Sequence, residues 1–136
     1  MKIREERVIR VVSTGKIRGI KYWIVEQGLY NSIQDKWGIW YCAYIKPPRS
    51  WRKLDVEELN LYPHGGITWI GELPSTGCYV WGWDYNHCND ISWNDNNFLE
   101  TKLQVLGREK AINIITRDIV DFIGGLFDEI GNENII

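Results

Sequence analysis

Residues 107–131 read GREKAINIITRDIVDFIGGLFDEIG. Large apolar side chains recur in this segment at steps of three and four residues, which places them on one face of an α-helix. The members of this face are Ile112, Ile115, Ile119, Phe122, Leu126 and Ile130. Gly107 precedes the helix, and Gly131 is a typical residue just beyond a helix end. Gly124 and Gly125 cost about 1 kcal/mol each against alanine, so we expect a kink or a close helix-to-sheet approach there.

Three apolar runs rich in β-branched and aromatic residues lie further toward the N-terminus, at residues 7–12, 20–25 and 37–45. Such runs are typical of β-strands. A turn signal at 13–16 joins the first two as a hairpin, and Gly28 ends the second. Both faces of residues 37–45 (WGIWYCAYI) are apolar. We therefore expect this segment to be a central strand of a covered sheet.

Two further segments lie between the predicted strands and helix. Pro47 and Pro48 end the third run, because proline cannot donate to a sheet ladder. Residues 50–59 (SWRKLDVEEL) predict a short helix with Ser50 as its N-cap. Residues 85–98 are rich in Asn and Asp and predict a loop.

Residues 66–73 and 78–83 predict an antiparallel pair of strands joined by a turn at 74–77 (PSTG). Together with the other runs, this pair and the C-terminal helix indicate an α+β fold. The architecture expected is an antiparallel β-sheet packed against a long C-terminal α-helix, in a single domain over residues 1–136.

Composition excludes several classes of protein. The chain has 136 residues, of which 44% are hydrophobic, so a packed core is expected rather than disorder. The net charge is −2, and this argues against bulk attraction to nucleic acid phosphates. The N-terminal end is locally basic, but Glu5 and Glu6 interrupt its charges, and we interpret it as a solvated strand face rather than a binding arm. The basic residues are Lys2, Arg4, Arg7, Arg10, Lys16 and Arg18.

No apolar run is long enough for a membrane-spanning helix, and no secretory signal is recognised at the N-terminus. The three cysteines, Cys42, Cys78 and Cys88, form no CxxC motif, which argues against a disulfide framework or a zinc ribbon. Cys42 and Cys78 fall within strand patterns and are expected to be packed thiols. The cytoplasm is the expected compartment.

Both histidines, His64 and His87, lie beside predicted strand ends. Asp84-x-x-His87-x-x-Asp90 is the main candidate for chemistry, because carboxylate and imidazole can bind a metal or form a general base with its orienting acid. Antiparallel pairing of 66–73 with 78–83 brings His64 and Asp84 to the same end of the pair. An alternative is that these groups only cap turns. No standard zinc motif is present, so no metal is expected.

Tryptophans surround this cluster, namely Trp69, Trp81, Trp83 and Trp93. Tyr79, Trp81 and Trp83 share one face of their strand by its period of two. They fit either core packing beneath the C-terminal helix or stacking on a base. Gly65 and Gly66 fit either a backbone approach to an anion or a tight turn at a strand start. No phosphate loop is present, and no cofactor is expected.

The segments 64–69 (HGGITW) and 80–90 (VWGWDYNHCND) resemble a group of uncharacterised small proteins of phages, prophages and plasmids. The pattern of that group runs approximately HGGLTY, then WWxGFDxxHxGD, then a C-terminal helix. The resemblance covers about residues 37–130, with the strongest part at 64–90. Trp83 stands where Phe is usual, and Asn89 stands where Gly is usual. The resemblance implies a mobile-element origin, action in the host cytoplasm and an accessory role.

Three functions are consistent with these observations. The first is a non-catalytic inhibitor of host antiviral defence, which blocks a defence protein or sequesters a small nucleotide messenger. Its expected binding residues are His64, Gly65, Gly66, Trp69, Trp81, Trp83, Asp84, His87, Asp90 and Trp93. The second is a small hydrolase or metal-dependent phosphoesterase that uses His64, Asp84, His87 and Asp90. The third is a homo-oligomeric structural role, since exposed aromatic side chains favour self-association.

Overall fold

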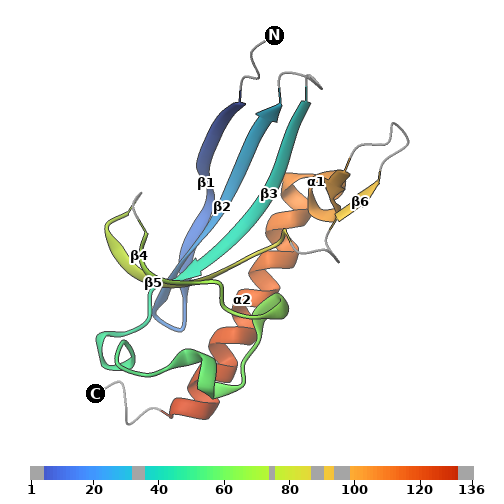
Figure 1. Ribbon diagram of the computed structural model, residues 1–136. Coiled ribbons are helices and arrows are strands. Elements are labelled where there is room, and N and C mark those ends of the chain that lie inside the picture. Colours follow the sequence, from blue (N-terminus) through green and yellow to red (C-terminus); the bar gives the residue numbers. More distant parts are fainter. Residues whose placement is uncertain (1–4, 32–35, 74–75, 87–90, 94–98, 132–136) are drawn as a thin grey trace.

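The computed structural model describes residues 5–31, 36–73, 76–86, 91–93 and 99–131. It confirms the α+β class (Figure 1). The strands are β1 (Glu5–Ile17), β2 (Ile20–Asn31), β3 (Lys36–Ile45), β4 (Trp69–Leu73), β5 (Cys78–Asp84), β6 (Ile91–Trp93) and β7 (Leu99–Thr101). The α-helices are α1 (Lys102–Leu106) and α2 (Arg108–Ile130), and the 3-10 helices are η1 (Arg49–Trp51), η2 (Val56–Leu59) and η3 (Pro63–Gly65).

Five strands form an antiparallel sheet in the order β1-β2-β3-β5-β4, so β3 is central as predicted. Helix α2 lies along one face of this sheet, here called the helix face (Figure 1). Its buried residues are Ala111, Ile115, Ile119, Phe122, Ile123, Leu126 and Ile130. The Gly131 amide donates to Phe127 O at 2.9 Å and ends the helix as expected. No helix in the described part of the chain is both long and apolar enough to cross a membrane.

The first hairpin is longer than its pattern predicts. The turn expected at 13–16 is wrong, because β1 continues through these residues after an irregularity between Val11 and Ser13. The chain reverses instead at Arg18 and Gly19, both of which have positive φ angles, 51° and 82°. Gly28 lies inside β2 and pairs with Val8 and Ile39. Polar residues can extend a strand when a neighbouring strand supplies hydrogen-bond partners, and periodicity alone does not detect this.

The helix predicted over 50–59 is also wrong. Two 3-10 turns replace it, η1 and η2, and Pro48 rather than Ser50 stands at the first N-cap. The Asp55 side chain accepts a hydrogen bond of 3.1 Å from the Glu57 amide and begins the second turn. Such a side-chain bond gives the backbone an alternative to continuing a single helix. The expected loop at 85–98 contains the short strand β6, which pairs with β7.

The other face of the sheet, here called the open face, carries a second apolar cluster. Its buried members are Trp23, Val25, Cys42, Tyr44, Leu73 and Val80. Tyr44 pairs with Gly82 across β3 and β5, and its ring lies where a Cβ atom on residue 82 would be. Because glycine leaves that space empty, the Tyr44 ring can lie flat over the neighbouring strand. The Tyr44 ring therefore forms part of the open-face surface near the end of β5.

Candidate functional site

The β4–β5 pair brings the two halves of the histidine-rich segment together, as predicted. Trp69 pairs with Gly82, and the Thr68 amide donates to Gly82 O at 2.9 Å. Two residues further along β5, Thr68 Oγ1 donates a hydrogen bond of 3.1 Å to Asp84 Oδ2. The residues that precede β4 therefore lie beside the end of β5.

Asp84 stabilises the turn by which the chain leaves the sheet at the end of β5. Its Oδ1 accepts a hydrogen bond of 3.0 Å from the Asn86 amide, while Oδ2 accepts from Thr68. A carboxylate that accepts from the amide two residues later forms an Asx turn. The turn-capping interpretation of Asp84 is thus confirmed, and the carboxylate also faces a hollow on the open face.

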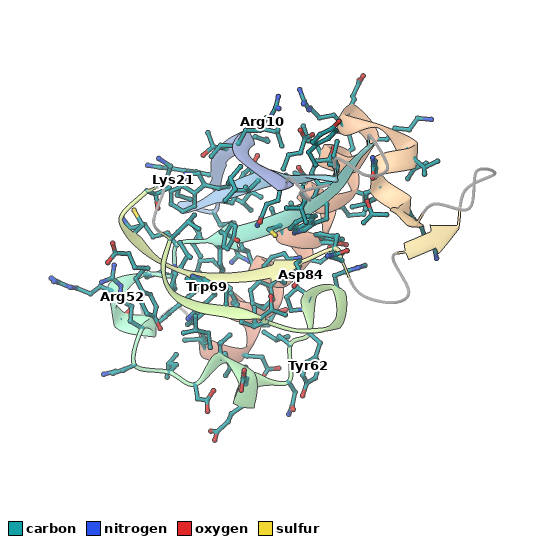
Figure 2. All side chains as sticks on the ribbon, turned by 45° about the horizontal axis from the view of Figure 1, so that its top comes forward. Arg10, Lys21, Arg52, Tyr62, Trp69 and Asp84 are labelled. Carbon is teal, nitrogen blue, oxygen red and sulfur yellow. The ribbon has the colours of Figure 1, made fainter. Side chains whose placement is uncertain are left out.

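This hollow has a volume of about 480 Å³. Its lining residues are Gln27, Trp40, Cys42, Tyr44, Thr68, Trp69, Trp83, Asp84 and Asn86. They come from β2, β3, the start of β4 with the residue before it, and the end of β5 with the chain just after it. Figure 2 shows Trp69 and Asp84, which lie at this hollow on neighbouring strands. Small-ligand sites in proteins have volumes in this range, with apolar walls and a few oriented polar groups.

The walls of the hollow combine aromatic rings with amide and carboxylate groups. Trp69 is 45% exposed, whereas Tyr44 is buried and Trp40 is half-buried. Gln27 Nε2 donates to Cys42 Sγ at 3.1 Å, which orients the Gln27 amide on the floor. Burial raises the pKa of the Cys42 thiol to about 11, so this sulfur remains protonated at neutral pH. The hollow therefore offers stacking and hydrogen bonding rather than a thiolate nucleophile.

His64 occupies a strained turn just before β4. Its φ angle is 42°, and the Gly66 amide donates to Pro63 O at 3.0 Å to close the turn. The tight-turn interpretation of Gly65 and Gly66 is thus confirmed, since both have positive φ angles. A left-handed conformation at a non-glycine residue is uncommon and is often retained where function requires it.

The His64 ring stacks on Tyr85, with ring centroids 4.2 Å apart. Tyr85 is buried on the helix face, and its hydroxyl donates to Asp118 Oδ2 at 2.7 Å while accepting from Trp83 Nε1 at 3.0 Å. His64 and Asp84 thus lie at one end of the β4–β5 pair, where His64 contacts the helix-face cluster and Asp84 faces the open-face hollow.

The remaining predicted residues fall into three groups. Trp81 and Trp83 have their side chains in the helix-face core, with exposed fractions of 0% and 1%, and Trp83 packs edge-on against Phe122. The core-packing interpretation of this face is confirmed, because its indoles are covered by α2. Trp93 belongs to β6. His87 and Asp90 lie outside the described residues, so their convergence with His64 and Asp84 stays a prediction.

Several residues that shape this region were not predicted from the sequence pattern. Gln27, Trp40 and Tyr44 line the hollow, and Tyr85 and Asp118 form the contact with His64. The open-face residues follow the period of two in β2 and β3, which was available from the sequence. The strand register that places these residues beside Asp84 could not be predicted from the sequence. Among the described residues, no three His, Cys, Asp or Glu side chains gather as metal ligands would.

Comparison with known proteins found no matching family model, no matching curated protein and no matching solved structure.

Proposed function

We propose that this protein acts by binding a small ligand with a planar heterocycle in the open-face hollow. The observation that carries the proposal is the position of Trp69, a residue that is 45% exposed at the wall of a hollow that Asp84 also lines. A partly exposed indole beside oriented hydrogen-bonding groups is suited to stacking on a base while its edge is bound.

The polar groups match the edges of a nucleobase. The Asp84 carboxylate accepts hydrogen bonds, and the Gln27 amide carries both a donor and an acceptor. The volume of about 480 Å³ suits a ligand of nucleotide size better than a peptide or a duplex. Within the accessory role that the motif resemblance implies, this chemistry favours sequestration of a nucleotide messenger in the host cytoplasm over blockade of a defence complex.

Isothermal titration calorimetry with a panel of cyclic mononucleotides and cyclic dinucleotides tests this function. We expect at least one member to bind, and Trp69→Ala to weaken that binding roughly 5- to 150-fold, because base stacking on an aromatic ring is worth about 1–3 kcal/mol. Ile70→Ala is the matched control. Ile70 is 47% exposed on the same strand, pairs with Trp81 and does not line the hollow.

Two results would contradict the proposal. One is the absence of binding to every member of the panel. The other is an equal loss of affinity in Trp69→Ala and Ile70→Ala, which would indicate a general effect of altering β4 rather than stacking at residue 69. Thermal melts of both variants establish that each is folded under the conditions of the titration.

A further inference from the structure

A second hollow, here called the basic groove, lies at the tip of the β1–β2 hairpin and has a volume of about 750 Å³. Its lining residues are Lys16, Arg18, Gly19, Ile20, Lys21, Lys46, Pro47, Pro48, Arg49, Arg52 and Phe127. Six of these are lysine or arginine, and none of the lining residues is Asp or Glu. This concentration of positive charge is unexpected in a chain whose net charge is −2.

Three separate segments supply the cations. Lys16 and Lys21 are cross-strand partners near the hairpin tip, and the Lys46 amide donates to Lys21 O at 2.9 Å just after β3 ends. Arg49 begins η1, and Arg52 follows it. Lys21 and Arg52 lie toward the same edge of the molecule (Figure 2). Like charges placed directly across a strand pair are destabilising, so the pairing of Lys16 with Lys21 lowers the stability of the hairpin tip.

Arg18 is held in place by both backbone and side chain. Its φ angle of 51° is in the left-handed region, where arginine is strained and Asn, Asp or Gly is usual. Its guanidinium lies 3.9 Å from the centroid of the Phe127 ring, within range of a cation–π interaction. Phe127 in turn packs edge-on against Trp51, at 5.2 Å between ring centroids. The fully buried Trp51 thus anchors both η1 and the ring beneath Arg18.

Among the described residues, none of the groove cations forms an ion pair with an acid. The ion pairs in this part of the chain join Glu26 to Arg10 and Arg108, further along the sheet. Asp128 and Glu129 follow Phe127 in α2 but do not line the groove. An anionic ligand with more than one charge would relieve the mutual repulsion of these side chains.

We propose that the basic groove binds two or more adjacent phosphate groups of a nucleotide or of a short single strand. Guanidinium groups bind phosphate in a bidentate manner, and Arg18, Arg49 and Arg52 supply three of them. Ile20, Pro47 and Pro48 add apolar walls that suit a sugar or base attached to the phosphates. The volume suits a nucleoside polyphosphate or a few nucleotides of a single strand. The groove shares no lining residue with the open-face hollow, so this inference does not depend on the proposed function.

Titration calorimetry at low salt, about 50 mM, tests the inference with inorganic tripolyphosphate, a nucleoside triphosphate and a single-stranded oligonucleotide of about six nucleotides. The double variant Arg49→Glu/Arg52→Glu should weaken binding about tenfold or more, because charged hydrogen bonds to phosphate are lost. The matched control is Lys53→Glu/Lys110→Glu, which changes the net charge equally at exposed lysines outside the groove. It should change the affinity no more than about twofold.

The source of the phosphates follows from the order of affinities. Tighter binding of the nucleoside triphosphate indicates a small nucleotide, and tighter binding of the oligonucleotide indicates a strand backbone. Both results support the inference, provided that tripolyphosphate competes with the preferred ligand. Binding to none of the three ligands, or an equal loss of affinity in both double variants, would overturn the inference.

Arg18→Gly separates binding from folding. Glycine adopts a positive φ readily, so this change relieves backbone strain while it removes the guanidinium. We expect the hairpin to remain folded and the affinity for the preferred phosphate ligand to fall several-fold. Unchanged affinity in a folded Arg18→Gly protein would show that the strained arginine has no part in binding. Trp69→Ala should leave phosphate binding unchanged. A loss of binding in the open-face hollow is therefore distinguishable from a loss of phosphate binding in the basic groove.

Discussion

Glu26 and Arg108 join the sheet to the first residue of α2 through two hydrogen bonds of 3.0 Å, one from Nε and one from the terminal Nη2. Tyr41 on β3 donates a third bond of 2.9 Å to the same carboxylate, and Arg10 on β1 lies 3.5 Å away. Burial by itself raises the pKa of Glu26. The hydrogen bonds from Arg108 and Tyr41, with the charges of Arg108 and Arg10, outweigh burial and hold this pKa below its usual value.

Glu26→Gln should lower the free energy of unfolding at neutral pH by about 1–3 kcal/mol, because charged hydrogen bonds to a buried acceptor are weakened. The ionised Glu26 stabilises the folded state fully above its unfolded pKa of about 4.5. This stabilisation is lost as the pH falls from there through the lowered folded pKa. Urea denaturation of the wild-type protein and of Glu26→Gln across this pH range measures the loss of stability. The difference between them should shrink in acid, and a difference that is constant with pH would contradict the ionised state of Glu26.

Cys42 should react slowly with iodoacetamide in the folded protein at pH 8. Its thiol is buried and its pKa is raised to about 11, so little thiolate is present and little of it is accessible. Mass spectrometry of proteolytic peptides resolves this cysteine from Cys78, which is only half-buried. The same reaction in denaturant is the control and should label both. Fast labelling of Cys42 without denaturant would show that the open-face cluster opens readily.

Gly82→Ala should destabilise the protein by about 1–3 kcal/mol, in the range of overpacked core positions. A Cβ atom at residue 82 would overlap the Tyr44 ring and lie 3.0 Å from Ala43 O, so the ring must move or the strands must separate. Urea denaturation gives the stability change, and a displaced Tyr44 should also weaken ligand binding in the open-face hollow. A neutral effect would mean that Tyr44 does not lie over β5.

Gly124→Ala should stabilise the protein by about 0.5–1 kcal/mol, because alanine favours a helix interior and nothing lies within 4 Å of the new Cβ. Gly125→Ala is the neighbouring comparison. Its Cβ would lie 2.9 Å from Leu61 Cδ2, so the flexible end of Leu61 must shift and part of the gain is lost. Thermal and urea melts of the two variants rank them. Equal stabilisation would show that Leu61 does not pack against the helix at this glycine.

The close approach at Gly125 was predictable in part from the sequence. The paired glycines predicted a kink or a close helix-to-sheet approach, but the residue that packs closely at Gly125 is Leu61, from the connection before η3 rather than from a strand. The end of the helix at Gly131 was predictable because its causes are local. The turn at Arg18 and Gly19 was not, because an arginine with positive φ contradicts the usual composition of such turns.

The position of the candidate site was predictable from the sequence, but the residues that line it were not. His64, Trp69 and Asp84 indicated the end of the β4–β5 pair, which the strand pairing confirms. Whether a tryptophan forms a wall or belongs to the core depends on which sheet face α2 covers. Trp81 and Trp83 are buried for this reason, while Trp69 remains at the surface.

Local periodicity was enough to predict the central strand, the β4–β5 pair and the long amphipathic helix. The contacts between distant side chains depend on how these elements pack together. Strand register set Gln27 and Trp40 beside Asp84, and the hairpin tip, η1 and Phe127 together form the basic groove. The physical reason is that periodicity is a property of neighbouring residues, whereas a site is formed by contacts between segments far apart in the chain.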